Sequence, residues 1–222
     1  MSMTFSSLQT MVSYIVDDLN FQYFTQTQIQ FWLNNAQREV QKKLLQTPGD
    51  WYNIRVTTPT VQYQSDYVLP TNFLKIHRVE LVLSGTPPNE VKGPIAFITP
   101  NELDQLPPGP GTPSCAYILQ NVMSIYPAPD TANQTIRLFY SYLVADMVNP
   151  TDNPDVPYQY EELIGLLAAR DAFIKDQRDP TPLDTKIAYY DEMMKRDAQQ
   201  REVTQGRRIV QTEGESAYTA AY

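Results

Sequence analysis

The chain has 222 residues, a net charge of −8 at pH 7 and 42% hydrophobic residues, which is enough for a globular core in one or two domains. The acidic balance argues against nucleic-acid binding by a basic face, because phosphate contacts require clustered Lys and Arg. A single cysteine excludes an intrachain disulfide, and a single histidine argues against a zinc site. No apolar run approaches the roughly 18 residues of a membrane span, and the N-terminal segment lacks the basic region of a signal peptide.

Two helices are predicted in the first 45 residues. Apolar side chains recur at spacings of three and four in residues 8–19 and again in residues 29–44, which places one apolar stripe on each helix. The stripes consist of Leu8, Met11, Val12, Ile15, Val16 and Leu19, and of Ile29, Trp32, Leu33, Ala36, Val40 and Leu44. Thr25 followed by Gln28 predicts a capping box at the start of the second helix.

Between Trp51 and Val144 the pattern changes to short segments with a period of two, rich in β-branched and aromatic residues. This pattern predicts a mainly antiparallel β domain. Gln120 and Asn121 predict a tight hairpin, since Asn tolerates positive φ. Thr99 and Glu102 predict a short capped helix within this region. In YVLPTNFLKIHRVEL, residues 67–81, the proline predicts a turn, and a change of face after it predicts a β-bulge.

Helical periodicity returns after a Pro- and Asp-rich linker at residues 149–157. The third stripe consists of Tyr160, Leu163, Ile164, Leu167 and Ile174, and the fourth of Leu183, Ile187, Tyr190 and Met194. The order predicts an α+β fold in which N-terminal and C-terminal helical pairs form a four-helix bundle-like domain around an inserted β domain. The expected boundaries are 1–48 and 149–202 for the helical pairs, 49–148 for the β domain, and 203–222 for an extended C-terminal arm.

No catalytic residue, cofactor or metal site is predicted, and the chain is expected not to be an enzyme. A nucleophilic pair of Cys115 and His77 has no supporting local motif, and the glycines do not form a phosphate-binding loop. His77 is expected to be a surface or hydrogen-bonded histidine on a strand. The paired acids of DDLN, YEEL and DE (Asp191 and Glu192) are interpreted as solvated helix faces or as partners of helix dipoles.

Several stretches, taken in order, resemble the head-to-tail adaptor (connector) proteins of tailed bacteriophages, in particular those of short-tailed phages. They are LQTMVSYIVDDLN with TQTQIQFWLNNAQREV, YVLPTNFLKIHRVEL, NVMSIYPAPDTANQTIRLFYSY, and the late helix from Tyr160. The resemblance covers roughly residues 8–198, and it depends on the order and spacing of these motifs.

The resemblance implies a structural virion protein, made in the host cytoplasm and located at the virion neck. Such adaptors form homo-oligomeric rings, commonly dodecamers, below the portal protein, and they support DNA ejection by extending the channel. Double-stranded DNA passes through the channel of such a ring without specific binding. Tail hub, nozzle or tail-fibre proteins dock on the ring, and no membrane is involved. The C-terminal arm often reaches the portal. The arm residues expected to bind it here are Arg207, Arg208, Ile209, Val210, Tyr218 and Tyr222.

Ring contacts require one face of a subunit to match a different face of its neighbour. The helix residues expected to be exposed and to make such contacts are Phe31, Leu45, Leu166, Phe173 and Tyr189. Two alternatives remain open: a stopper or other neck or tail ring component, and a carbohydrate- or receptor-binding module based on the Tyr-rich β domain.

Overall fold

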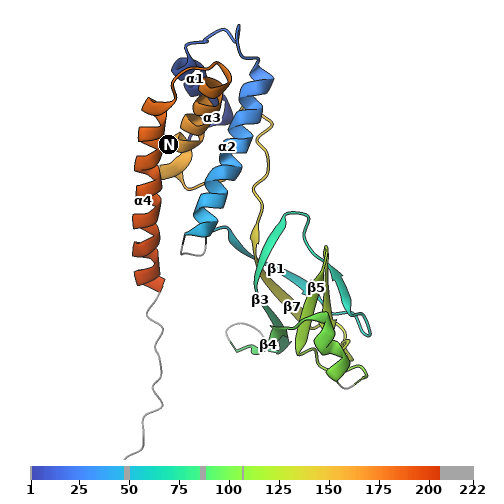
Figure 1. Ribbon diagram of the computed structural model, residues 1–222. Helices are drawn as coiled ribbons and strands as arrows, with labels where there is room; N and C mark the ends of the chain where they lie inside the picture. Colours follow the sequence, from blue (N-terminus) through green and yellow to red (C-terminus); the bar gives the residue numbers. More distant parts are fainter. Residues whose placement is uncertain (1, 48–50, 86–88, 107, 206–222) are drawn as a thin grey trace, which may run out of the picture. The chain divides into compact units, whose positions relative to one another are not determined.

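The computed structural model describes residues 2–47, 51–85, 89–106 and 108–205, and its architecture is α+β (Figure 1). The chain divides into two compact units. Met1–Gly49 with Val148–Tyr222 forms one, here called the helical unit, and Asp50–Met147 forms the other, here called the β unit. The described part of the helical unit contains α1 (Phe5–Val16), α2 (Gln26–Gln46), α3 (Glu161–Lys175) and α4 (Thr181–Gln205). A short 3-10 turn, Tyr158–Tyr160, leads into α3.

Helix α3 is the centre of the helical unit, because α1, α2 and α4 all pack against it. Its buried side chains are therefore not confined to one stripe. They include Leu163, Ile164, Leu166, Leu167, Ala168, Ala169 and Ala172. Gly165 permits the close approach of α1, since a Cβ at this position would lie 2.7 Å from Met11 Sδ. The sequence pattern placed Ile174 on the buried stripe of this helix. That prediction is wrong, because Ile174 is exposed near the end of the helix.

The connection between α1 and α2 is organised by a buried carboxylate. Helix α1 ends where Asp17 adopts a left-handed conformation, so Leu19 lies beyond the helix and is exposed, contrary to its expected place in the stripe. Burial opposes ionisation of Asp18, but backbone N–H groups of Gln22, Tyr23 and Phe24 donate to its carboxylate and lower its pKa. The carboxylate thus fixes the loop that leads into α2.

Two other expectations about the helices have different outcomes. The capping box is confirmed, because Thr25 Oγ1 accepts the Gln28 N–H and the Gln28 side chain accepts the Thr25 N–H. Glu161, expected on a solvated face or at a helix end, begins α3 and is buried. Its carboxylate accepts hydrogen bonds from the Ser2 hydroxyl and the Met3 N–H, so it ties the N-terminal segment to α3.

The β unit contains a seven-stranded mixed sheet with the order β1-β7-β3-β4-β5-β6-β2. The strands are β1 Asn53–Pro59, β2 Asp66–Val68, β3 Phe73–Ser84, β4 Val91–Phe97, β5 Cys115–Leu119, β6 Val122–Tyr126 and β7 Thr135–Tyr142. Every pairing between these strands is antiparallel except that of β4 with β5. One side of the sheet forms the core, which includes Tyr67, Val79, Leu81, Ile125, Ile136, Leu138 and Tyr140.

Local predictions for the β unit are confirmed with two changes of detail. The hairpin between β5 and β6 forms, but the positive φ of 53° falls on Gln120 and not on Asn121. The short capped helix is a 3-10 helix, Pro100–Gln105, and the Glu102 carboxylate accepts the Thr99 N–H. The register of β3 on β7 shifts between Phe73 and Lys75 and again between Ile76 and Arg78, so the strand contains the expected irregularity.

Candidate interaction surfaces

The two residues weighed as a nucleophilic pair have separate, structural surroundings. His77 is exposed on β3, and its Nε2 lies 2.6 Å from Ser141 Oγ. Cys115 is buried on β5, its Sγ donates to the Tyr126 carbonyl oxygen at 3.3 Å, and burial raises its pKa. Within the described ranges, no three His, Cys, Asp or Glu side chains lie together as a metal site.

The helix residues proposed as ring contacts differ widely in exposure. Phe31 is 62% exposed and Tyr189 is 65% exposed, whereas Leu45 and Phe173 are half-buried. Leu166 is only 1% exposed, so its selection as an exposed contact is wrong. It lies in α3, which is covered by three helices. The six arm residues from Arg207 to Tyr222 lie outside the described residues.

Phe31 belongs to a cluster at the N-terminal end of α2, here called the aromatic tip and formed by Phe24, Phe31, Trp32 and Lys175. Phe24 and Trp32 meet edge to face with ring centroids 5.4 Å apart, and Lys175 Nζ lies 5.6 Å from the Trp32 centroid. A shallow cavity of about 440 Å³ is lined by Thr25, Thr27, Gln28, Phe31, Trp32 and Lys175. Within this cluster Phe31 is exposed, and aromatic residues are enriched at protein interfaces. The sequence signal was Phe31 itself, an aromatic residue outside the apolar stripe.

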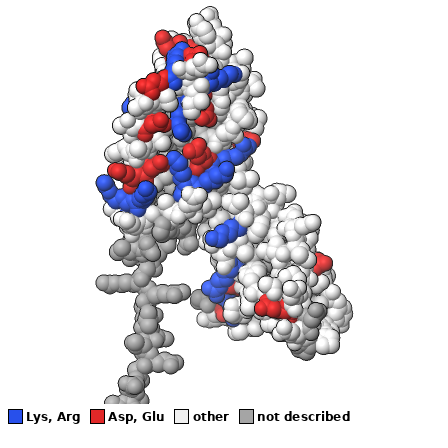
Figure 2. Space-filling model, viewed as in Figure 1, with Lys and Arg blue, Asp and Glu red and all other residues white. Residues whose placement is uncertain are grey.

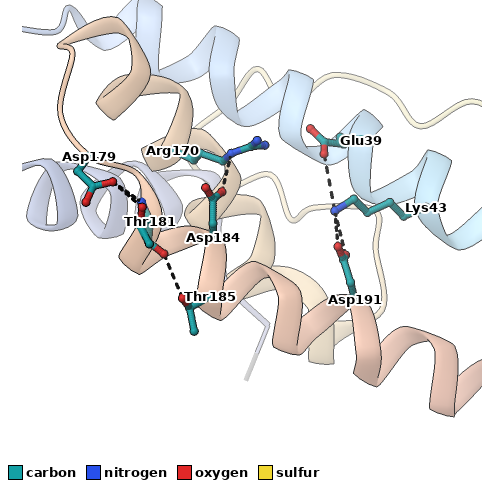
Figure 3. Close-up of polar contacts among 8 residues, drawn as sticks. All are labelled: Glu39, Lys43, Arg170, Asp179, Thr181, Asp184, Thr185 and Asp191. Carbon is teal, nitrogen blue, oxygen red and sulfur yellow. Dashed lines mark hydrogen bonds and ion pairs between the residues drawn. The ribbon is translucent and has the colours of Figure 1, made fainter.

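Helix α4 is held within the helical unit by an apolar stripe and by polar contacts, and Figure 3 shows the polar contacts. The stripe consists of Leu183, Ile187, Met194 and Ala198, all buried. Lys43 Nζ of α2 lies 2.9 and 3.1 Å from the two carboxylate oxygens of Asp191, and 3.7 Å from Glu39. Arg170 of α3 forms an ion pair of 2.9 Å with Asp184. Such partly exposed pairs contribute about 0–1 kcal/mol each, so the apolar stripe holds α4 and the charges orient it.

The two ends of α4 have different surroundings. At its N-terminus, Asp179 accepts hydrogen bonds from the Thr181 N–H at 3.0 Å and hydroxyl at 2.6 Å, and the Thr185 hydroxyl donates to the Thr181 carbonyl at 3.1 Å (Figure 3). These contacts fix the start of the helix.

Further along, a groove of about 670 Å³ separates α4 from the last turn of α2. It is lined by Lys43, Gln46, Thr47, Asp191, Met194, Lys195 and Gln199.

The β unit carries its cations on the side of the sheet opposite the core. Four cross-strand rows lie on this side: Asn53–Ser141–Lys75, Arg55–Phe139–Arg78, Thr57–Arg137–Glu80 and Pro59–Thr135–Val82–Lys92. We call it the basic face, defined by Arg55, Lys75, Arg78, Lys92 and Arg137. In Figure 2, Lys and Arg atoms of the β unit gather on the side where Figure 1 shows β1, β3 and β4.

One ion pair on this face is nearly buried. Arg137 is 12% exposed and binds the Glu90 carboxylate through two guanidinium nitrogens, at 2.6 and 2.5 Å. The hydrogen bonds from Arg137 lower the pKa of Glu90 to about 2, with a further contribution from Lys92. This bidentate contact joins β7 to the start of β4. The sequence contains no local signal for it, because the two residues are far apart in the chain.

Comparison with known proteins identifies the chain at the level of the family. The family model described as SU10 adaptor protein matches residues 3–215, which include all of the β unit and all four helices. No curated protein matches the chain. Among the described residues, no helix is both long enough and apolar enough to cross a membrane.

Proposed function

Because the chain belongs to the SU10 adaptor protein family, a family of phage adaptors, we propose that it forms a ring below the portal at the virion neck. The ring would extend the DNA channel and provide a platform on which tail hub, nozzle or tail-fibre proteins dock. The family match over residues 3–215 carries this proposal, because it covers nearly the whole chain. In more specific terms, we propose that the ring contains twelve copies and that the phage is short-tailed.

The helical unit supplies surfaces suited to a closed ring. Head-to-tail contacts require two different patches on each subunit, one for each neighbour. The aromatic tip, with Phe31, is one candidate, and the exposed face of α4 around Tyr189 is the other. The contacts of α3 with α1, α2 and α4 support treating the four helices as one bundle that carries both patches.

The direct test is assembly on the portal. The full chain would be mixed with its portal protein, and the mass of the complex measured by native mass spectrometry and its shape by electron microscopy. A ring of many copies on the portal is expected. A protein that stays monomeric and does not bind the portal would contradict the proposal. A monomeric state in the absence of the portal would not contradict it, because the subunits need to contact one another only once they are bound to the portal.

The C-terminal arm provides a second test. Helix α4 extends to Gln205, so a truncation that removes residues 206–222 leaves the described helix intact. We expect this truncation to weaken portal attachment and to preserve the helical circular dichroism signal. Equal portal binding by the truncated and full chains would exclude a portal-binding role for Arg207, Arg208, Ile209, Val210, Tyr218 and Tyr222.

A stopper or other neck ring component remains the alternative placement. A map of the virion neck distinguishes the two, because an adaptor contacts the portal and a stopper lies beyond the adaptor. Carbohydrate or receptor binding has less support. A cavity between described residues of the β unit measures only about 160 Å³ and is lined mainly by apolar residues such as Val56, Leu69 and Ile136.

A further inference from the structure

The β unit is electrostatically polarised in a way that its net charge conceals. From Asp50 to Met147 the chain contains five Lys and Arg residues, and all five lie on the basic face: Arg55, Lys75, Arg78, Lys92 and Arg137. His77 lies on the same side, because it contacts Ser141. Among the residues that the structure describes, Glu80 pairs with Arg78, and Glu90 pairs with Arg137 and Lys92. The five cations thus outnumber the carboxylates that the described ion pairs bring to this side of an acidic protein.

The cations on this face differ in their freedom to bind another molecule. Arg137 is committed to Glu90 and is nearly buried. Arg78 is 60% exposed although it pairs with Glu80, and Lys92 is 43% exposed although it pairs with Glu90. Arg55 and Lys75 are exposed, and neither forms an ion pair with a described residue. Arg55 and Lys75 are therefore the two groups that gain most from an external anion.

The arrangement of the face suits a repeating anion. Arg55 and Arg78 flank Phe139 from the two neighbouring strands, which places their Cα atoms about 10 Å apart. Successive rows on one side of a sheet repeat at roughly 7 Å, so the four rows span about 20 Å. A DNA duplex carries about one negative charge per 1.7 Å of its axis. Several phosphates are thus available over the length of the face.

Neutral polar groups also lie on this face, around the central Phe139. Asn53 and Thr57 stand beside the cations in the same rows. Phosphate groups are bound by Arg and Lys together with Asn, Ser and Thr side chains. Interfaces with DNA are more polar and more positively charged than interfaces between proteins, which are enriched in aromatic residues at their core. The composition of this face favours DNA over an acidic protein surface.

We propose that the basic face of the β unit contacts the phosphate backbone of double-stranded DNA without reading its sequence. Arg55 and Lys75 provide the principal contacts, and Arg78 and Lys92 assist. The inference concerns the isolated chain as well as any ring, so it does not depend on the proposed assembly. It adds to the adaptor role a surface that holds DNA weakly and releases it as ionic strength rises.

The test measures binding of the full chain to a fluorescent double-stranded oligonucleotide by anisotropy at several salt concentrations. The variant combines Arg55→Gln with Lys75→Gln. Loss of two phosphate contacts should lower the magnitude of the slope of log K against log salt by about 1.8. Over a fourfold rise in salt, the wild type should then lose about 12-fold more affinity than the variant.

The matched control combines Lys186→Gln with Arg196→Gln, which removes the same charge from exposed positions on α4. This control should bind DNA as the wild type does. Equal affinity and slope for wild type and the Arg55/Lys75 variant would overturn the proposal, as would a wild type that does not bind DNA at low salt. Loss of self-association in the variant without DNA, with DNA binding unchanged, would instead identify a second copy of the chain as the partner.

The two proposals fail in different ways. Portal assembly without any DNA binding would contradict only the role of the basic face. DNA binding that depends on Arg55 and Lys75, in a chain that does not assemble on the portal, would contradict only the adaptor ring.

Discussion

Replacing Leu166 by alanine tests how α3 is packed. The side chain is 1% exposed, in a helix that α1, α2 and α4 all contact. Transfer of a leucine side chain out of water contributes about 1.5–3 kcal/mol, and the cavity left by truncation adds to the loss. We therefore expect Leu166→Ala to lower the free energy of unfolding of the helical unit by about 2–5 kcal/mol. That is a large share of the roughly 5–15 kcal/mol typical of a whole domain.

The assay is urea unfolding followed by far-ultraviolet circular dichroism in the helical band, since α1 to α4 all belong to the helical unit. Phe31→Ala is the matched control. Its side chain is 62% exposed, so truncation should change the free energy of unfolding by less than about 0.5 kcal/mol. The effects on portal assembly should be in the reverse order. Phe31→Ala should weaken assembly more than its small effect on the free energy of unfolding explains. A cost below about 1 kcal/mol for Leu166→Ala would refute the assignment of this side chain to the core.

Three further predictions concern single interactions. Thr25→Ala removes the capping box with Gln28 and should lower the free energy of unfolding by about 1 kcal/mol in the same urea assay, whereas no change would show that the box is dispensable. Arg137 lowers the pKa of Glu90 from 4.5 to about 2, so this contact stabilises the fold above pH 4.5 and loses that effect as the pH falls towards 2. Thermal melts at several pH values should therefore show a steeper acid loss for wild type than for Glu90→Gln, and parallel curves would contradict this. Cys115 is buried with a raised pKa, so a thiol reagent should modify it slowly in native protein and rapidly in urea, and equal rates would contradict its burial.

The local structure of this protein follows closely from its sequence. The spacing of three and four predicted all four helices, and the capping box at Thr25 predicted the start of α2. The period of two between Trp51 and Val144 predicted a mainly antiparallel β domain, and the interruption in β3 was foreseen as a change of face. These features depend on residues close together in the chain, so a short window contains the information that determines them.

The faces of the helices were less predictable. A helical stripe shows which side is apolar, but it does not show how many neighbours the helix has. Leu166 lies off the expected stripe and is buried, because α3 is covered by three other helices. Leu19 and Ile174 lie on the expected stripes and are exposed, because one follows the end of α1 and the other is close to the end of α3.

The sequence by itself determined the order and type of the elements, since period, capping and turn residues act over a few positions. Their order was also sufficient to suggest the family to which the chain belongs. Only the tertiary structure decided which distant residues share a surface. Arg55 and Arg78 flank one aromatic ring because both β1 and β3 pair with β7, and Arg137 meets Glu90 across a long separation. Register and helix packing place such groups together, whereas the net charge of the chain does not show where the charged groups lie.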